Sequence, residues 1–153
     1  MKMKMGMRIG FEDDRFFERI LDILTESTVG LVSIHARTVK GGYNSTPSYD
    51  HVAHAVQRLR CPVLLNGSVE TGEHALALRK KTGAHGIMIG RSAIRNPWIF
   101  RQIRDLQSGR KIFQPKLADL FDYFEDLYAS LEKPEMREES LVGRMKKFLN
   151  LHF

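Results

Sequence analysis

The sequence predicts an α/β fold of parallel strands and helices, followed by a small all-α appendage. Four short apolar segments are each followed by a segment with the periodicity of an amphipathic helix, and this alternation runs from residue 2 to residue 106. Because each new strand follows a helical crossover, neighbouring strands are expected to be parallel. After Gly109 the pattern changes to helices alone. The chain is therefore divided into residues 1–109 and residues 110–153.

The expected strands are short apolar runs that end at polar residues or glycine, at residues 2–9, 31–36, 62–65 and 86–89. The helices that follow them are expected at residues 11–26, 49–59, 72–81 and 97–106. Asp13 or Asp14 is a candidate cap for the first helix. Pro97 suits the first turn of the fourth helix. Two further helices, at residues 116–131 and 135–153, form the appendage.

Two architectures are compatible with four consecutive strand–helix units. One is an open doubly wound sheet, and the other is part of a (β/α)8 barrel. A complete barrel needs roughly 250 residues, whereas this chain has 153. Four units could form only half of such a barrel.

Composition narrows the class of protein. With 42% hydrophobic and 27% charged residues, a folded core is expected rather than disorder. No apolar run is long enough to span a bilayer. The first seven residues alternate Met with Lys or Gly, unlike a signal peptide, so a cytoplasmic location is expected. The formal net charge of +6 favours polyanionic partners such as nucleic acid.

Cys61 is the single cysteine, which excludes an intrachain disulfide and any metal site with several cysteines. The histidines show no metal-ligand spacing either, so no metal is expected. Cys61 begins the third strand, about 16 Å from Asn66 at the other end at the usual rise per residue. Parallel α/β folds place their functional residues at the carboxyl ends of the strands, and Cys61 lies at the opposite end. Cys61 is therefore interpreted as a buried structural thiol.

Polar residues and glycines follow the strand ends. The third strand ends at Asn66 and Gly67, and the fourth ends at Gly90 and Arg91. Glycine lets backbone N–H groups approach a phosphate, a helix start favours negative charge, and arginine matches phosphate oxygens. Either loop alone is better interpreted as an ordinary turn, but two such loops at consecutive strand ends favour an anion site. His35 is either a donor to a ligand or a histidine satisfied by the backbone.

These motifs resemble the tRNA-dihydrouridine synthase family. The resemblance rests on five segments in the family's order, at residues 7–10, 35–38 with Tyr43, 61–67, 82–91 and 96–100. It implies the C-terminal half of an FMN-binding (β/α)8 barrel, followed by part of a helical tRNA-binding domain. It also implies an oxidoreductase that reduces uridine in tRNA to 5,6-dihydrouridine, with NADPH as the reductant of the flavin.

The resemblance also assigns roles to individual residues. His35 and Arg8 lie where the family contacts the flavin, and the family grips the FMN phosphate at positions that match Asn66, Gly67, Gly90 and Arg91. Gly6 stands where the family usually has a lysine, and Lys4, on the same strand face, is expected to substitute in part. The residues expected to contact tRNA are Arg37, Arg144, Lys146 and Lys147.

The family's catalytic cysteine lies upstream of the strand at which this chain starts. The resemblance therefore implies a fragment that lacks the N-terminal half-barrel and this cysteine, and that works only with a complementing half, which a separate chain could supply. Two alternatives stay open at this point. One is a non-catalytic tRNA-binding remnant, and the other is a different FMN-dependent barrel oxidoreductase.

Overall fold

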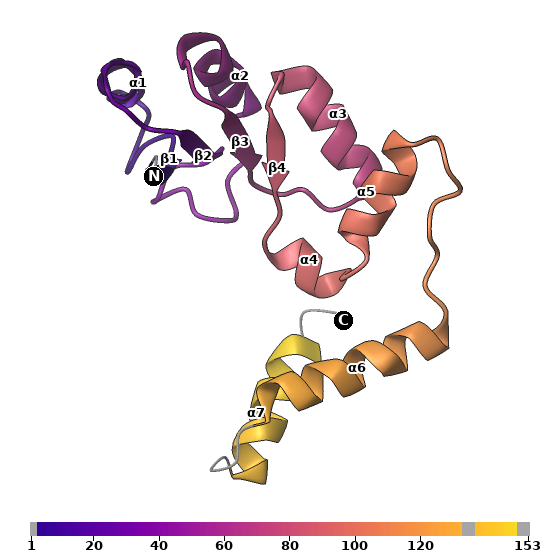
Figure 1. Cartoon of the computed structure of the whole chain (residues 1–153). Coiled ribbons are helices and arrows are strands. Elements are labelled where there is room, and N and C mark those ends of the chain that lie inside the picture. The colour runs from indigo at the N-terminus through magenta and orange to yellow at the C-terminus, as the bar shows by residue number, and fades with distance from the viewer. Residues whose placement is uncertain (1–2, 133–136, 150–153) are drawn as a thin grey trace. The chain divides into compact units, whose positions relative to one another are not determined.

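The computed structural model describes residues 3–132 and 137–149, and the chain divides into two compact units. The first unit is Met1–Gly90 and the second is Arg91–Phe153 (Figure 1). The alternation of strand and helix predicts a boundary after residue 109 instead. The division falls earlier because the residues that follow Gly90 pack mainly among themselves.

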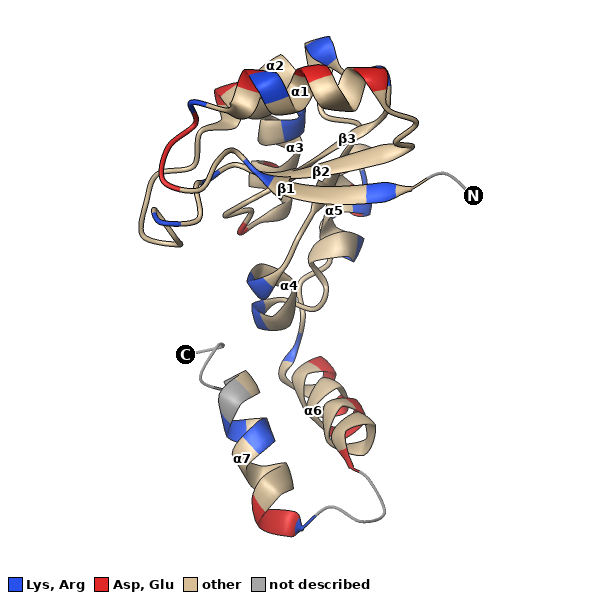
Figure 2. Cartoon of the chain, turned by 90° about the vertical axis from the view of Figure 1, so that its left-hand side faces the viewer, with Lys and Arg blue, Asp and Glu red and all other residues tan. Residues whose placement is uncertain are grey.

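The first unit alternates strands and helices in the predicted order. Its elements are β1 (Lys4–Arg8), α1 (Phe17–Glu26), β2 (Leu31–His35), α2 (Tyr49–Arg58), β3 (Val63–Asn66), α3 (Gly72–Thr82) and β4 (Gly86–Met88). Neighbouring strands are all parallel, and their spatial order β1-β2-β3-β4 follows the chain. A doubly wound sheet reverses its strand order and places helices on both faces. The sequential order, with α1, α2 and α3 on one face (Figure 2), agrees instead with a partial (β/α)8 barrel.

Alternate residues of the central strands form the core of this unit. Val32 and Ile34 of β2 are fully buried, as are Val63 and Leu65 of β3. Successive side chains of a strand point to opposite faces, so these four lie together on the helix-covered face. The helices contribute further fully buried side chains, namely Leu21, Val52, Ala55 and Ala75. Burying each of the larger aliphatic side chains contributes about 1.5–3 kcal/mol.

The first helix begins later than its periodicity predicts. α1 begins at Phe17, and no described side chain caps it. The expected cap by Asp13 or Asp14 is wrong because both carboxylates are engaged elsewhere. Asp13 accepts hydrogen bonds from the backbone N–H and the Nε of Arg15, which lowers the pKa of Asp13. Asp14 contacts His51 of α2 at 2.8 Å.

The second unit is helical. It contains α4 (Arg91–Arg95), α5 (Ile99–Gln107), α6 (Leu117–Leu131) and α7 (Glu138–Leu149). α4 was not predicted, because five residues are too few to show a helical period. α6 and α7 lie side by side (Figure 1), and Leu141 of α7 is buried. Among the described residues, no helix is long and apolar enough to cross a lipid bilayer.

Candidate functional site

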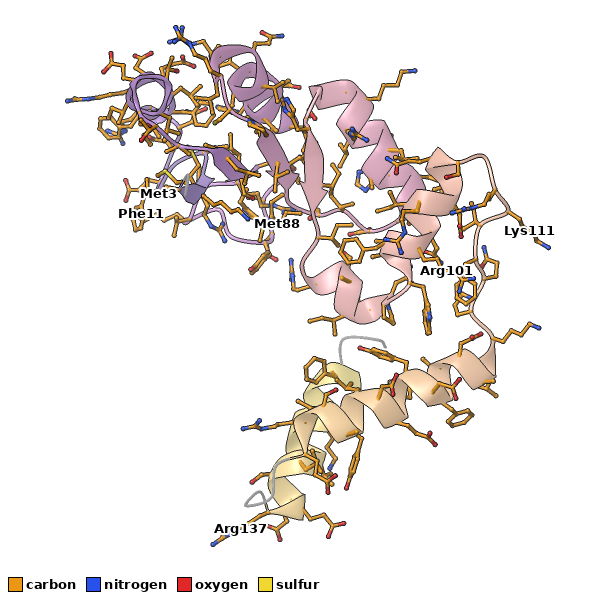
Figure 3. The ribbon with its side chains drawn as sticks, in the orientation of Figure 1. Met3, Phe11, Met88, Arg101, Lys111 and Arg137 are labelled. Atoms are coloured by element: carbon orange, nitrogen blue, oxygen red, sulfur yellow. The ribbon has the colours of Figure 1, made fainter. Side chains whose placement is uncertain are left out.

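Three of the predicted site residues form one row across the sheet. The parallel register pairs Arg8 with His35, and His35 with Asn66. The row continues to Met88 of β4, which is 49% exposed (Figure 3). Each of these four residues ends its strand. The row therefore lies at the carboxyl edge of the sheet, where parallel α/β folds place their ligands.

The row lies on the face of the sheet turned away from α1, α2 and α3, which no described helix of the first unit covers. Lys4, Gly6 and Arg8 alternate along β1 on this face, and a Cβ placed on Gly6 would meet no described atom within 4 Å. The strands enclose a shallow hollow of about 520 Å³ that reaches from Lys4 and Leu31 to the row at the carboxyl edge. Polar and apolar side chains share its lining, so the hollow can receive a ligand that has a flat apolar part and polar edges.

Lys4 and Arg8 share this face but lie at opposite ends of β1. Lys4 is paired in register with Leu31, whereas Arg8 is paired with His35. Gly6 lies midway, so Lys4 is about 7 Å from the position at which the family has its lysine, at about 3.3 Å per residue. A lysine side chain is long enough to cover that distance, so Lys4 remains a candidate for the flavin contact that the resemblance implies.

The loop that follows β2 contacts two residues of the row. Arg8 Nη1 donates to the carbonyl oxygen of Thr38 at 2.9 Å, and its guanidinium lies 5.9 Å from the centre of the Tyr43 ring. The ring of His35 meets Tyr43 edge-on, with 6.1 Å between ring centres. Arg8 and His35 are thus oriented by one loop, although they come from different strands.

The loop Asn66–Gly67–Ser68, here termed the glycine loop, has an unusual backbone. Gly67 has φ of 125° and Ser68 has φ of 47°, values that side chains other than glycine seldom adopt. Three hydrogen bonds hold it. The backbone N–H of Ala36 donates to the oxygen of Asn66 at 2.9 Å, Tyr49 Oη donates to the oxygen of Gly67 at 3.0 Å, and Arg37 Nη2 donates to Ser68 Oγ at 2.8 Å.

Arg37, which was expected to contact tRNA, is turned into the protein. It is 5% exposed, and its Nε donates to the carbonyl oxygen of Ser45 at 2.5 Å. Its Nη1 is buried and finds no hydrogen-bond partner among the described residues. The guanidinium therefore connects the loop after β2 to the loop after β3, and its charge is directed at the glycine loop.

Tyr49 is the first residue of α2 and of the helix expected at residues 49–59. Burial raises the pKa of its phenol; nearby Arg37 opposes this shift and Glu70 adds to it. The phenol therefore stays protonated near neutral pH and remains a donor to Gly67. A tyrosine in the first turn of a helix that follows a strand end is the pattern that could have revealed this contact.

Gly90 and Arg91 fall on either side of the division between the units. Gly90 ends the first unit, and a Cβ placed on it would meet no described atom within 4 Å. Gly90 does not have a positive φ, so its backbone conformation does not require glycine. Only the close approach of a ligand would require a glycine at this position. Arg91 begins α4 in the second unit, a short helix that the sequence pattern does not predict.

The cations expected to contact tRNA lie mainly on α7. Arg144 and Lys146 are exposed, and the side chain of Lys147 falls outside the described residues. α7 begins with Glu138 and Glu139, so its charge is mixed (Figure 2).

Cys61 precedes β3, at the end of that strand opposite Asn66, as predicted. Its exposure is intermediate, so the expectation of a buried thiol is wrong. The residue lies at the margin of the sheet and not in its core.

Comparison with known proteins identifies the family. The family model for dihydrouridine synthase (Dus) matches residues 1–152. A probable tRNA-dihydrouridine synthase of Aquifex aeolicus is 34% identical over 108 residues, covering 69% of this chain and 34% of that protein. The tRNA-dihydrouridine synthase B of Xanthomonas axonopodis is 30% identical over 137 residues, covering 86% of this chain and 41% of that protein. The chain thus covers 34% and 41% of the length of these two relatives, and it belongs to the dihydrouridine synthase family.

Proposed function

We propose that this chain supplies part of the FMN site and part of the tRNA-binding surface of an enzyme that reduces uridine in tRNA to 5,6-dihydrouridine. The proposal rests on the row of Arg8, His35 and Asn66 beside the constrained glycine loop, in a chain of this family. NADPH is the proposed reductant. When bound, FMN supplies the hydride chemistry, and the protein orients the flavin and the uracil.

The residues present fit such a cofactor. Asn66 offers an amide, Gly67 has a backbone conformation that favours glycine, and Gly90 has no described atom within 4 Å of a Cβ placed on it. These features suit a phosphate, and the guanidinium of Arg91 is proposed to bind it as well. Arg8, His35 and Lys4 place cationic or donor groups along the open face of the sheet. Donors of this kind stabilise the electron-rich edge of a flavin ring.

The site needs further strands. β1 and β4 each have one strand neighbour within the described sheet, whereas a closed barrel has no edge strands. We propose that additional strands, in the same polypeptide or in a separate N-terminal half-barrel chain, cover the open face and bring the cysteine that protonates the uracil. Cys61 is at the wrong end of β3 for this role.

Titration of the purified chain with FMN tests the cofactor part of the proposal. Asn66→Ala is expected to weaken FMN binding about tenfold, the effect of one lost hydrogen bond to a charged group. Gln57→Ala, which removes an exposed amide from α2, is the matched control and is expected to leave affinity unchanged. Equal affinities for the two variants would remove Asn66 from the site. Failure of the folded wild-type chain to bind FMN would favour the alternative of a tRNA-binding remnant.

The activity part is tested with tRNA that lacks dihydrouridine, FMN and NADPH. We expect the chain by itself to form no dihydrouridine, because no described cysteine lies near the row of Arg8, His35 and Asn66. Adding the N-terminal part of a relative should restore the product. Product formed by the chain alone would refute the need for a complementing half.

A further inference from the structure

The positive charge of the chain is concentrated in residues 91–116. This segment holds seven Lys and Arg against one Asp, a net charge of +6, which equals the formal charge of the whole chain. Residues 117–153 hold five Lys and Arg against eight Asp and Glu, a net charge of −3. A polyanion therefore meets its strongest attraction before α6 begins and not on α6 and α7.

Much of this charge lines one hollow of about 780 Å³ within the second unit, between α5 and residues 110–116, here termed the α5 basic hollow. Its cations are all exposed, and they are Arg101, Arg104, Arg110, Lys111 and Lys116. Figure 3 labels Arg101 on α5 and Lys111 in the segment that follows. Asp105 is the single carboxylate of the described lining.

Asp105 is 8% exposed and is already engaged. It accepts hydrogen bonds from Arg110 Nε at 3.3 Å and from the backbone N–H of Phe113 at 3.1 Å. Its carbonyl oxygen accepts from the backbone N–H of Arg110 at 2.9 Å. The carboxylate therefore attaches the segment to α5 and neutralises one arginine. Among the described lining residues, no carboxylate remains for the other four cations.

Arg101 is held in a defined plane. Its guanidinium lies 3.7 Å from the centre of the Phe113 ring, and Phe113 also meets Trp98 with 6.2 Å between ring centres. A guanidinium stacked on an aromatic face keeps its N–H edge free for a planar or tetrahedral anion. Phosphate oxygens are the acceptors that this edge matches best.

The cations come from two stretches of the chain, α5 and residues 110–116, and not from a single turn. Arg101 and Arg104 are one turn apart on α5, with about 5–6 Å between their Cβ atoms, and the other three follow along residues 110–116. A row of this kind fits charges that repeat along a polymer better than it fits a single ion. We propose that the α5 basic hollow binds the sugar–phosphate backbone of RNA. This inference rests on the proposed function, in which the RNA is tRNA.

The test uses the full chain, a fluorescently labelled unmodified tRNA transcript, and anisotropy at increasing KCl. Arg101→Gln with Arg104→Gln is expected to weaken binding at least tenfold. The slope of log affinity against log salt should fall by about 1.4 to 1.8, since each of the two lost phosphate contacts contributes about 0.7–0.9. The control, Arg19→Gln with Arg60→Gln, removes the same charge from exposed positions of the first unit and should change binding less than about twofold.

A second variant protects the test against misfolding of α5. Lys111→Gln with Lys116→Gln removes two cations outside any helix and should reduce the salt slope by a similar amount. If both double variants bind tRNA as the control does, the hollow is not the RNA site, although the proposed function stands. If the wild-type chain binds no tRNA, the tRNA part of the proposed function fails together with this inference.

Competition separates RNA from other anions. At equal ionic strength, inorganic phosphate should displace tRNA no better than chloride does, and poly-L-glutamate should displace it less well than unlabelled tRNA at equal charge. Strong displacement by inorganic phosphate would assign the hollow to a small phosphate compound. Displacement by poly-L-glutamate equal to that by tRNA would assign it to an acidic protein segment. Either result would overturn the inference.

Discussion

At the scale of single residues, Arg37 shows how a buried cation can shape a neighbouring loop. Its Nε and Nη2 reach Ser45 and Ser68, which lie in loops after two different strands. Ser68 has φ of 47°, a conformation that costs of order 1–3 kcal/mol and persists only when the surroundings enforce it. We therefore attribute the shape of the glycine loop in large part to Arg37.

Arg37→Gln is expected to lower the free energy of unfolding by about 1–3 kcal/mol, because hydrogen bonds to a buried charge are lost. Urea denaturation followed by circular dichroism measures this change. Arg60→Gln, at an exposed position, is the control and should stay within about 0.5 kcal/mol of wild type. Similar stabilities for both variants would mean that Arg37 does not hold the loop.

The contribution of Tyr49 to the free energy of unfolding depends on pH. Because its pKa is raised above the ordinary value of 10.0, the folded protein holds the phenolic proton more tightly than the unfolded chain does. Its contribution to stability is therefore complete below pH 10 and is lost as pH rises through the higher pKa of the folded state.

Tyr49→Phe removes the donor to Gly67 and should cost about 1 kcal/mol at neutral pH. The difference in unfolding free energy between wild type and this variant should shrink as the pH is raised beyond 10. Measuring both proteins in urea at neutral and alkaline pH checks the sign. A difference that grows with pH would contradict the proposed role of the neutral phenol.

At the scale of elements, the ends of helices decide how the loops are placed. α3 begins after Thr71, whose Oγ1 accepts a hydrogen bond from the backbone N–H of His74 at 3.1 Å. At its other end, Gly83 has φ of 69° and closes the helix in the left-handed conformation. The helix that follows the glycine loop is thus defined at both ends, unlike α1, which no described side chain caps.

Thr71→Ala should lower the free energy of unfolding by about 1 kcal/mol, the usual effect of losing an N-cap oxygen. Thr71→Ser keeps that oxygen and should retain most of the stability. Thermal or urea unfolding of the two variants in parallel measures the difference. Equal losses would point to the methyl group of Thr71 and not to its hydroxyl.

At the scale of the whole molecule, the two units offer separate reporters, and all residues proposed to contact FMN except Arg91 lie in the first unit. Trp98, the single tryptophan of the sequence, belongs to the second unit, whereas the row of Arg8, His35 and Asn66 belongs to the first. Ligand that binds only the folded state stabilises the unit that holds its site, by about 2.7 kcal/mol at a hundred times its Kd.

Saturating FMN should therefore raise the unfolding midpoint seen by circular dichroism more than the midpoint seen by Trp98 fluorescence. tRNA should shift the Trp98 midpoint, because the α5 basic hollow lies in the second unit. Equal shifts of both signals by each ligand would show that the chain unfolds as one cooperative body.

The sequence by itself determined the four strand–helix units, their parallel pairing and the polar strand ends, because apolar periodicity and turn residues act locally. The placement of Arg8, His35 and Asn66 at strand ends followed from this pattern. Only the tertiary structure decided that Arg37 is buried, that Tyr49 holds Gly67, and that Asp105 attaches a basic segment to α5. These contacts join residues of different elements, and the direction of such a side chain depends on packing that no local pattern encodes.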